Sequence, residues 1–227
     1  VLENVMSPPP YKLEGPDVFY PNWFGGTWDV RSTTSDVQSP CGPILFGGNA
    51  TYAKAREEIG KSLQYQSRFI SDGYDHIIAD REFNVKSIAK VAMGANSVVD
   101  VSTATPNKFS CLLSPTGLPS MLTVDLIVLN RRQENIDANN FHCSEVVREI
   151  VSAVGQSPAR PQSPLLKEIE TTSLYRLVSP TEIQCIQRSA TFLLPSQQDP
   201  MAYKLWEMSR GRPTDVRFYT VVYTKVR

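Results

Sequence analysis

The chain has 227 residues, of which 41% are hydrophobic, and its 23 Lys and Arg residues balance 23 Asp and Glu residues. This balance excludes a general electrostatic attraction to nucleic acid or to an anionic membrane surface. The sequence has no apolar run of the ~18 residues that a membrane-spanning helix needs, so we expect at most a peripheral association with membranes. A single all-β domain of this length can bury a large core.

The N-terminal residues 1–19 are expected to form an extended arm, and residues 20–227 a single folded domain. Three consecutive prolines, Pro8, Pro9 and Pro10, favour a polyproline conformation and forbid a helix. The arm is therefore either a disordered tail or a segment that docks on a partner through these prolines. Since the chain does not start with Met and shows no charged region followed by an apolar one, we expect any targeting segment to have been removed or left out.

The stretch Tyr20-Pro-Asn-Trp-Phe-Gly-Gly-Thr-Trp28 leads into a polar-rich strand pattern at 29–34. Its Gly-Thr-Trp end is similar to the Gly-x-Trp with which barrels of the lipocalin type often begin, where the indole closes one end of the barrel. In such barrels an arginine late in the chain commonly stacks on this tryptophan. We therefore predict that Arg217 stacks on Trp28 and helps to close the barrel.

Alternation of side-chain type with a period of two predicts β-strands along most of the remaining chain. Positions 63–69 alternate in this way, and Asp72-Gly73 supplies a hairpin signal before 77–79. Further strands are predicted at 121–130, 141–151, 165–177, 183–194 and 216–226. We therefore predict a mainly β fold, a lipocalin-like closed antiparallel barrel of roughly ten strands with one or two short helices.

Two segments depart from the strand pattern. Residues 80–94 place apolar side chains at helical spacing, with Asp80 as the N-cap and Gly94 after the last turn. Residues 200–208 form a second, shorter helical pattern, whose Met201 and Trp206 either pack on the core or face a partner. The stretches 35–48 and 156–164 are rich in Pro, Gly and Ser, so we expect exposed loops there.

The four cysteines lie far apart and form no Cys-x-x-Cys pair, which disfavours a zinc site. In an oxidising compartment we expect at least one disulfide, whereas in a reducing one they would be inert buried thiols. The candidates for pairing are Cys41, Cys111, Cys143 and Cys185.

The sequence predicts no catalytic residues and no metal site. Its only histidines are His76, beside a turn, and His142, whose strand neighbour Cys143 must point to the opposite face. Motifs of serine hydrolases, nucleotide-binding loops and zinc proteases do not occur. We therefore predict that the protein is not an enzyme.

Two pairs of carboxylates share strand faces, namely Glu168 with Glu170 and Glu145 with Glu149. A buried pair of this kind could supply an acid and a base. A solvated strand face explains both pairs more simply, and we expect that arrangement.

Aromatic side chains on the predicted strands could line a ligand cavity inside the barrel. The alternative is a barrel packed solid by these same side chains. The candidate lining residues are Tyr65, Phe69, Phe192, Phe218 and Tyr223. No histidine follows His142, which disfavours a haem held by a late-chain histidine.

The stretches 20–33, 78–89, 169–175 and 187–193 together resemble an uncharacterised family of chloroplast and cyanobacterial proteins with a lipocalin-like domain of unknown function. The resemblance covers about residues 16 to 227. It implies a location in the chloroplast thylakoid lumen, peripheral to the membrane, and the oxidising lumen would suit disulfides.

On this resemblance we expect a non-catalytic extrinsic subunit, or an assembly or stabilising factor, of a photosystem. It would contact photosystem subunits through the proline arm, the loop around Cys41 and the segment with Met201 and Trp206. The expectation includes no bound cofactor and no nucleic acid. The alternative is a lumenal carrier that holds an apolar ligand, such as a pigment, quinone or lipid, inside the barrel. An enzyme with a barrel pocket is a third possibility, for which no acid can be named.

Overall fold

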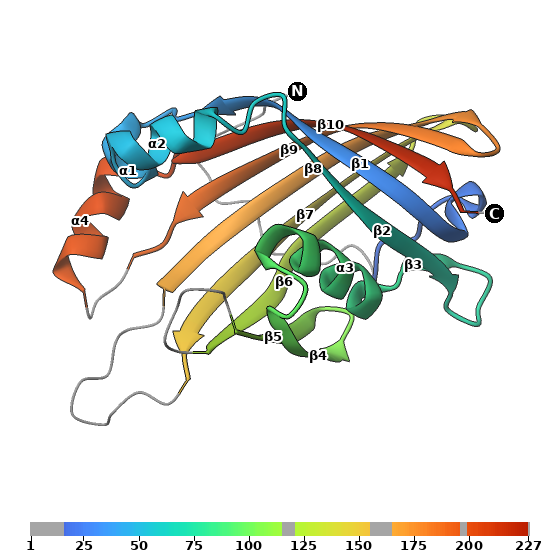
Figure 1. Ribbon diagram of the computed structural model, residues 1–227, viewed down its shortest axis with the longest axis horizontal. Helices are drawn as coiled ribbons and strands as arrows, with labels where there is room; N and C mark the ends of the chain where they lie inside the picture. Colours follow the sequence, from blue (N-terminus) through green and yellow to red (C-terminus); the bar gives the residue numbers. More distant parts are fainter. Residues whose placement is uncertain (1–15, 115–120, 155–164, 196–198, 227) are drawn as a thin grey trace.

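The computed structural model describes residues 16–114, 121–154, 165–195 and 199–226, and these ranges contain one ten-stranded antiparallel sheet (Figure 1). The strands lie side by side in the order β3-β2-β1-β10-β9-β8-β7-β6-β5-β4. Their bounds are β1 Gly26–Gln38, β2 Ser62–Ser71, β3 Ile77–Ala79, β4 Val98–Thr105, β5 Lys108–Leu113, β6 Leu122–Asn135, β7 Asn140–Ala153, β8 Leu165–Ser179, β9 Glu182–Leu193 and β10 Asp215–Lys225. The predicted mainly β fold and the predicted strand number are confirmed.

The closed barrel that the strand pattern predicted is not formed. β3 and β4 end the strand order, and the described residues contain no ladder between them, so the sheet is an open half-barrel. β3 has three residues, and the chain leaves it directly into α3, Arg81–Met93. This helix contacts both β2 and β4 and crosses the open side of the half-barrel (Figure 1). A helix thus occupies the place where a closed barrel would continue its strand pairing.

The other helices are η1 Asn22–Phe24, α1 Pro43–Phe46, α2 Asn49–Arg56 and α4 Pro200–Ser209. In Figure 1, α1, α2 and α4 gather at one end of the sheet. Within the described residues, no helix combines the length and the apolar character that crossing a membrane requires.

Both predicted helices are confirmed, together with the cap residues of the first. The Asp80 carboxylate accepts a hydrogen bond from the Phe83 N–H at 3.1 Å, and Gly94 ends α3. α4 begins after Asp199, whose carboxylate accepts from the backbone of Met201 and Ala202. The expected loop 35–48 is partly regular, since β1 continues to Gln38 and α1 follows. The loop expected at 156–164 lies outside the described residues.

The main core lies on one face of the sheet, where aromatic rings from five strands and the N-terminal segment meet. Trp28 and Phe141 are fully buried there, and the Trp28 Nε1–H donates to the Phe24 carbonyl at 2.6 Å. Val18, which we assigned to the arm, is also fully buried. The folded part therefore begins before Tyr20. The buried members are Val18, Phe24, Trp28, Val30, Phe69, Phe141, Cys143, Tyr175, Ile183, Cys185, Val221 and Tyr223.

The predicted stacking of Arg217 on Trp28 is wrong. β1 and β10 pair so that Lys225 lies opposite Trp28, and its Nζ is 5.1 Å from the centre of the indole. Arg217 lies opposite Val37 at the far end of the same ladder. There it pairs with Asp215 at 3.1 Å and with Glu58 at 2.8 Å. The antiparallel register, which no composition pattern reveals, decides which cation reaches the ring.

Candidate functional site

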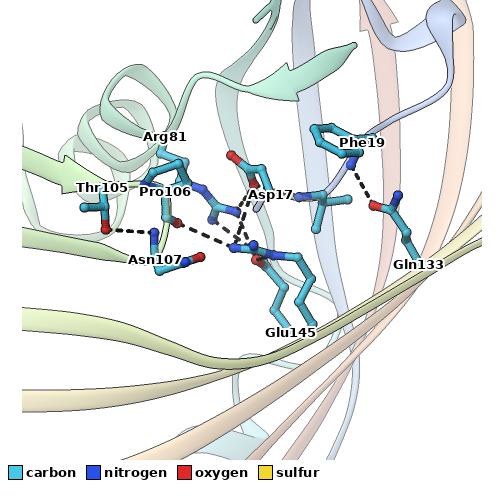
Figure 2. A network of polar contacts seen from close by, with 10 residues as sticks. Asp17, Phe19, Arg81, Thr105, Pro106, Asn107, Gln133 and Glu145 are labelled. Atoms are coloured by element: carbon cyan, nitrogen blue, oxygen red, sulfur yellow. Dashed lines mark hydrogen bonds and ion pairs between the residues drawn. The ribbon is translucent and has the colours of Figure 1, made fainter. Parts of the chain in front are cut away.

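A network of four charged side chains joins the N-terminal segment to α3 and to two strands (Figure 2). The Arg81 guanidinium lies 2.6 Å from the Asp17 carboxylate and 2.9 Å from that of Glu145. The Arg131 Nε–H donates to the same Glu145 carboxylate at 2.9 Å, and only 1% of the Arg131 side chain is exposed. Two cations therefore face two anions in a buried cluster, which keeps its formal charge balanced.

The position of each member follows from its element. β6 and β7 pair Arg131 directly with Glu145, on the same face as the core residue Cys143. Arg81 occupies the first turn of α3, immediately after the N-cap. Asp17 reaches the cluster from the N-terminal segment, whose next residues are held by two further contacts. The Phe19 N–H donates to the Gln133 side chain at 2.6 Å, and Tyr20 pairs with Ile77 of β3.

The pKa of Glu145 follows from this arrangement. Burial by itself raises the pKa of this carboxyl, but the guanidinium groups of Arg81 and Arg131 outweigh it and lower the pKa below its usual value. For Arg81, burial favours the neutral form, yet Glu145 and Asp17 raise the pKa of the guanidinium. Glu145 and Arg81 thus stabilise each other's charged form, and Arg81 in turn holds Asp17 of the N-terminal segment.

An acid dependence of stability follows from the lowered pKa of Glu145. A carboxylate of this kind stabilises the fold above its unfolded pKa of about 4.3, and the contribution is lost as the pH falls through the folded value. We expect the Glu145→Gln variant to be less stable at neutral pH. The free energy of unfolding of this variant, measured by urea titration, should also fall less steeply between about pH 5 and pH 3. The reason is that unfolding of the variant takes up at most about one proton fewer than unfolding of the unchanged protein.

The control for this measurement is Glu57→Gln, since Glu57 is exposed on the surface after α2. Its midpoint should follow the unchanged protein at every pH. Equal acid slopes for the unchanged protein and the Glu145→Gln variant would show that the network does not govern acid sensitivity.

Sequence reasoning missed this network because it treated Glu145 as solvated. The available signal was the alternation of side chains between the two faces of a strand, which places Glu145 on the same face as the apolar Phe141. Glu168 and Glu170 lie on the opposite face of their strand from the core residue Tyr175, but Glu168 is buried and not solvated as expected. It pairs with Arg148 at 2.6 Å, and the half-buried Glu170 pairs with Arg188 at 2.9 Å. Within the described ranges, no cluster of three or more His, Cys, Asp or Glu side chains suitable for holding a metal ion occurs.

The candidate cavity residues divide between the two faces of the sheet. Phe69 and Tyr223 belong to the buried aromatic core, and Tyr65 packs against it. Phe218 is three residues from the core residue Val221 of β10, and Phe192 is seven residues from the core residue Cys185 of β9. Because side chains alternate along a strand, these odd separations place Phe218 and Phe192 on the other face. Burial raises the pKa of Tyr65 to about 12, which agrees with a ring packed among others.

Of the two alternatives for the cysteines, the structure shows the free thiols, and none of the four forms a disulfide. Cys111, Cys143 and Cys185 are buried on β5, β7 and β9. Burial raises the pKa of Cys185 to about 12, so this thiol is not poised for reaction at neutral pH.

Two of the three predicted contact segments lie together in the structure. The Cys41 Sγ is 3.4 Å from the Pro213 carbonyl and 3.7 Å from that of Ser209, so the loop around Cys41 packs against the end of α4. The Met201 side of α4 is open to solvent, whereas Trp206 is half-buried and contacts the Tyr203 ring at 5.4 Å. The third segment, with Pro8, Pro9 and Pro10, lies outside the described residues.

The exposed apolar side of α4 follows from its sequence. Met201, Leu205 and Met208 have the spacing i, i+4, i+7 and therefore lie along one side of the helix. Met201 is 64% exposed and Met208 48% exposed. Ala202 and Ser209 lie on the side that turns inward. We name the exposed pair Met201 and Met208 the α4 surface.

A second surface feature is a groove of about 950 Å³ between α3 and the strands β1, β2 and β10. It is lined by basic, polar and apolar side chains, including Arg31, Gln64, Phe83, Lys90 and Val91. The groove has access from solvent and is separate from the α4 surface.

Comparison with known proteins gives one result. The family model described as "Domain of unknown function (DUF6816)" matches residues 13–227, which is nearly the whole chain. No curated protein and no solved structure matches the chain.

Proposed function

Since the chain belongs to the DUF6816 family, whose description states no function, we propose a role from its own surface: a non-catalytic extrinsic subunit, or an assembly or stabilising factor, that docks on photosystem subunits. The proposed location is the lumenal side of the thylakoid membrane, peripheral to it. Photosystem and lumen come from the resemblance to chloroplast and cyanobacterial lipocalin-like proteins, and the docking mode comes from the α4 surface.

The observation that carries the docking mode is the exposure of Met201 and Met208 on a well-capped helix. Large flexible apolar side chains exposed along one side of a helix suit a protein interface, where they lose water on contact. The Asp199 cap and the contact of the Cys41 loop with the end of α4 hold the helix in place without a partner. A preformed surface of this kind binds without a large ordering cost.

A carrier function is supported less well. Of the aromatic residues proposed to line a cavity, Phe69 and Tyr223 are packed in the core, where the Tyr223 ring lies 6.0 Å from that of Tyr175, and Tyr65 packs against this core. An interior ligand would have to displace these contacts. We therefore place the proposed interaction on the outside of the half-barrel.

The test of the proposed function uses the tagged chain in mild-detergent extracts of thylakoid membranes, separated on native gels. We expect the unchanged chain to migrate with a photosystem complex, and Met201→Glu combined with Met208→Glu to weaken this association by about tenfold or more. The matched control is Ile136→Glu, because Ile136 is also an exposed apolar residue, at 53%, but lies in the turn after β6. Migration of the unchanged chain as a free small protein would contradict the proposal.

A further inference from the structure

One edge of β2 carries backbone groups that α3 covers only in part. The Gln66 N–H donates to the Ser87 Oγ at 2.9 Å, and the Arg68 N–H donates to the Asn84 Oδ1 at 2.6 Å. The Asn84 amide also donates to the Arg68 carbonyl at 3.1 Å. Two polar side chains of the helix thus take the place of a neighbouring strand along this part of the edge.

The cover ends one turn further along α3. Asn84 and Ser87 face the edge, and the next turn of the helix brings Lys90 and Val91, neither of which offers a hydrogen-bond acceptor. Backbone groups point to the same edge at every second residue, so Gln64 presents its N–H and C=O in line with those of Gln66. Among the described residues, no partner is recorded for these Gln64 groups.

The uncovered edge opens on the groove between α3 and the sheet, which carries an excess of positive charge. Arg31, directly opposite Gln64 in the ladder, and Lys90 have no ion-pair partner among the residues that the structure describes. Lys86 also lines the groove and pairs with Glu82 at 2.5 Å. The described lining contains one carboxylate, Asp29, which accepts a hydrogen bond from the Gln66 side chain.

The opposite edge of the sheet lacks this combination. Against β5, β4 shows register shifts between Val98 and Asp100 and between Thr103 and Thr105. Bulges of this kind disturb an edge strand and hinder the addition of another strand. The pairing of β2 with β1 runs from Gly26 opposite Phe69 to Thr33 opposite Ser62 without a shift.

We propose that the Gln64 edge of β2 binds an extended, acidic peptide segment of a partner protein as an added strand. The peptide backbone pairs with the N–H and C=O of Gln64, and its carboxylates lie toward Arg31 and Lys90. Leu63, which is 42% exposed beside this edge, and Val91 offer apolar contacts to the alternate side chains. The proposal does not depend on the α4 surface or on the identity of the partner proposed for it.

The test is titration of the purified chain with a short fluorescent peptide of alternating Val and Glu, followed by anisotropy at low ionic strength. We expect saturable binding that weakens by about tenfold or more in Lys90→Glu, because the charge is reversed. Lys54→Glu, on the exposed surface of α2, is the matched control and should leave binding unchanged. A peptide with Gln in place of Glu should bind correspondingly more weakly.

Two further measurements separate strand addition from simple charge attraction. Val91→Asn places a third polar side chain on the side of α3 that carries Asn84 and Ser87. Its amide should pair with the free backbone groups of β2 in place of the peptide, and so weaken binding without disturbing the fold. Amide exchange at Gln64 should slow when the peptide binds, because its N–H becomes paired. Absence of saturable binding would overturn the proposal, as would binding that leaves both the Gln64 exchange rate and the affinity of Val91→Asn unchanged.

Discussion

Replacing Arg131 with methionine should lower the free energy of unfolding by about 3–5 kcal/mol, because it leaves buried carboxylates without one of their two cations. The Arg131 side chain is 1% exposed and donates to Glu145 at 2.9 Å, so solvent cannot take over its role. Methionine keeps much of the side-chain length, which limits the cavity. The measurement is urea unfolding at neutral pH, monitored by tryptophan fluorescence.

The control for Arg131→Met is Lys86→Met. The Lys86 side chain is 37% exposed, and its ion pair with Glu82 joins neighbouring turns of α3. An exposed pair of this type contributes little to stability, so Lys86→Met should leave the free energy of unfolding nearly unchanged. If the two variants lost the same amount of stability, the buried network would be no more important than a surface ion pair.

Replacing Trp28 with alanine should cost about 3–5 kcal/mol of stability, through loss of buried apolar surface and creation of a cavity. The indole is fully buried, donates to the Phe24 carbonyl and lies beneath Lys225. Trp28→Phe should cost less, since it keeps most of the packing and loses the hydrogen bond. Thermal and urea unfolding of both variants would measure the difference.

An exposed aromatic residue provides the comparison for Trp28. Tyr74 is 82% exposed in the turn between β2 and β3, so Tyr74→Ala should change the free energy of unfolding by less than about 0.5 kcal/mol. A loss of similar size in Trp28→Ala would mean that the indole does not close this end of the half-barrel.

Local signals in the sequence were sufficient for elements whose cause is local. α3 has its N-cap at Asp80 and ends at Gly94, as its residue types predict, because both caps act within one turn. The strands from β6 to β10 follow alternation that is visible in the chain. β4 and β5 were not identified, because the stretch Val98–Thr105 is rich in small and polar residues and its apolar alternation is weak.

Long-range register could not be predicted from the same signals. Whether the sheet closes depends on how β3, α3 and β4 pack, and no local pattern records that. The choice between Lys225 and Arg217 at Trp28 depends on the β1–β10 alignment. The ion network likewise joins residues that are far apart in the chain, so its members resemble ordinary surface charges when they are considered one at a time.

The pairing of β1 with β10 has a consequence for the order in which the protein can fold. Trp28 lies opposite Lys225, so the first long strand must wait for the last one before its second edge is covered. Contacts between chain ends close slowly, because a long loop must be ordered first. During synthesis, we therefore expect this second edge of β1 to stay unpaired until β10 is available, and an unpaired strand edge favours association with other chains.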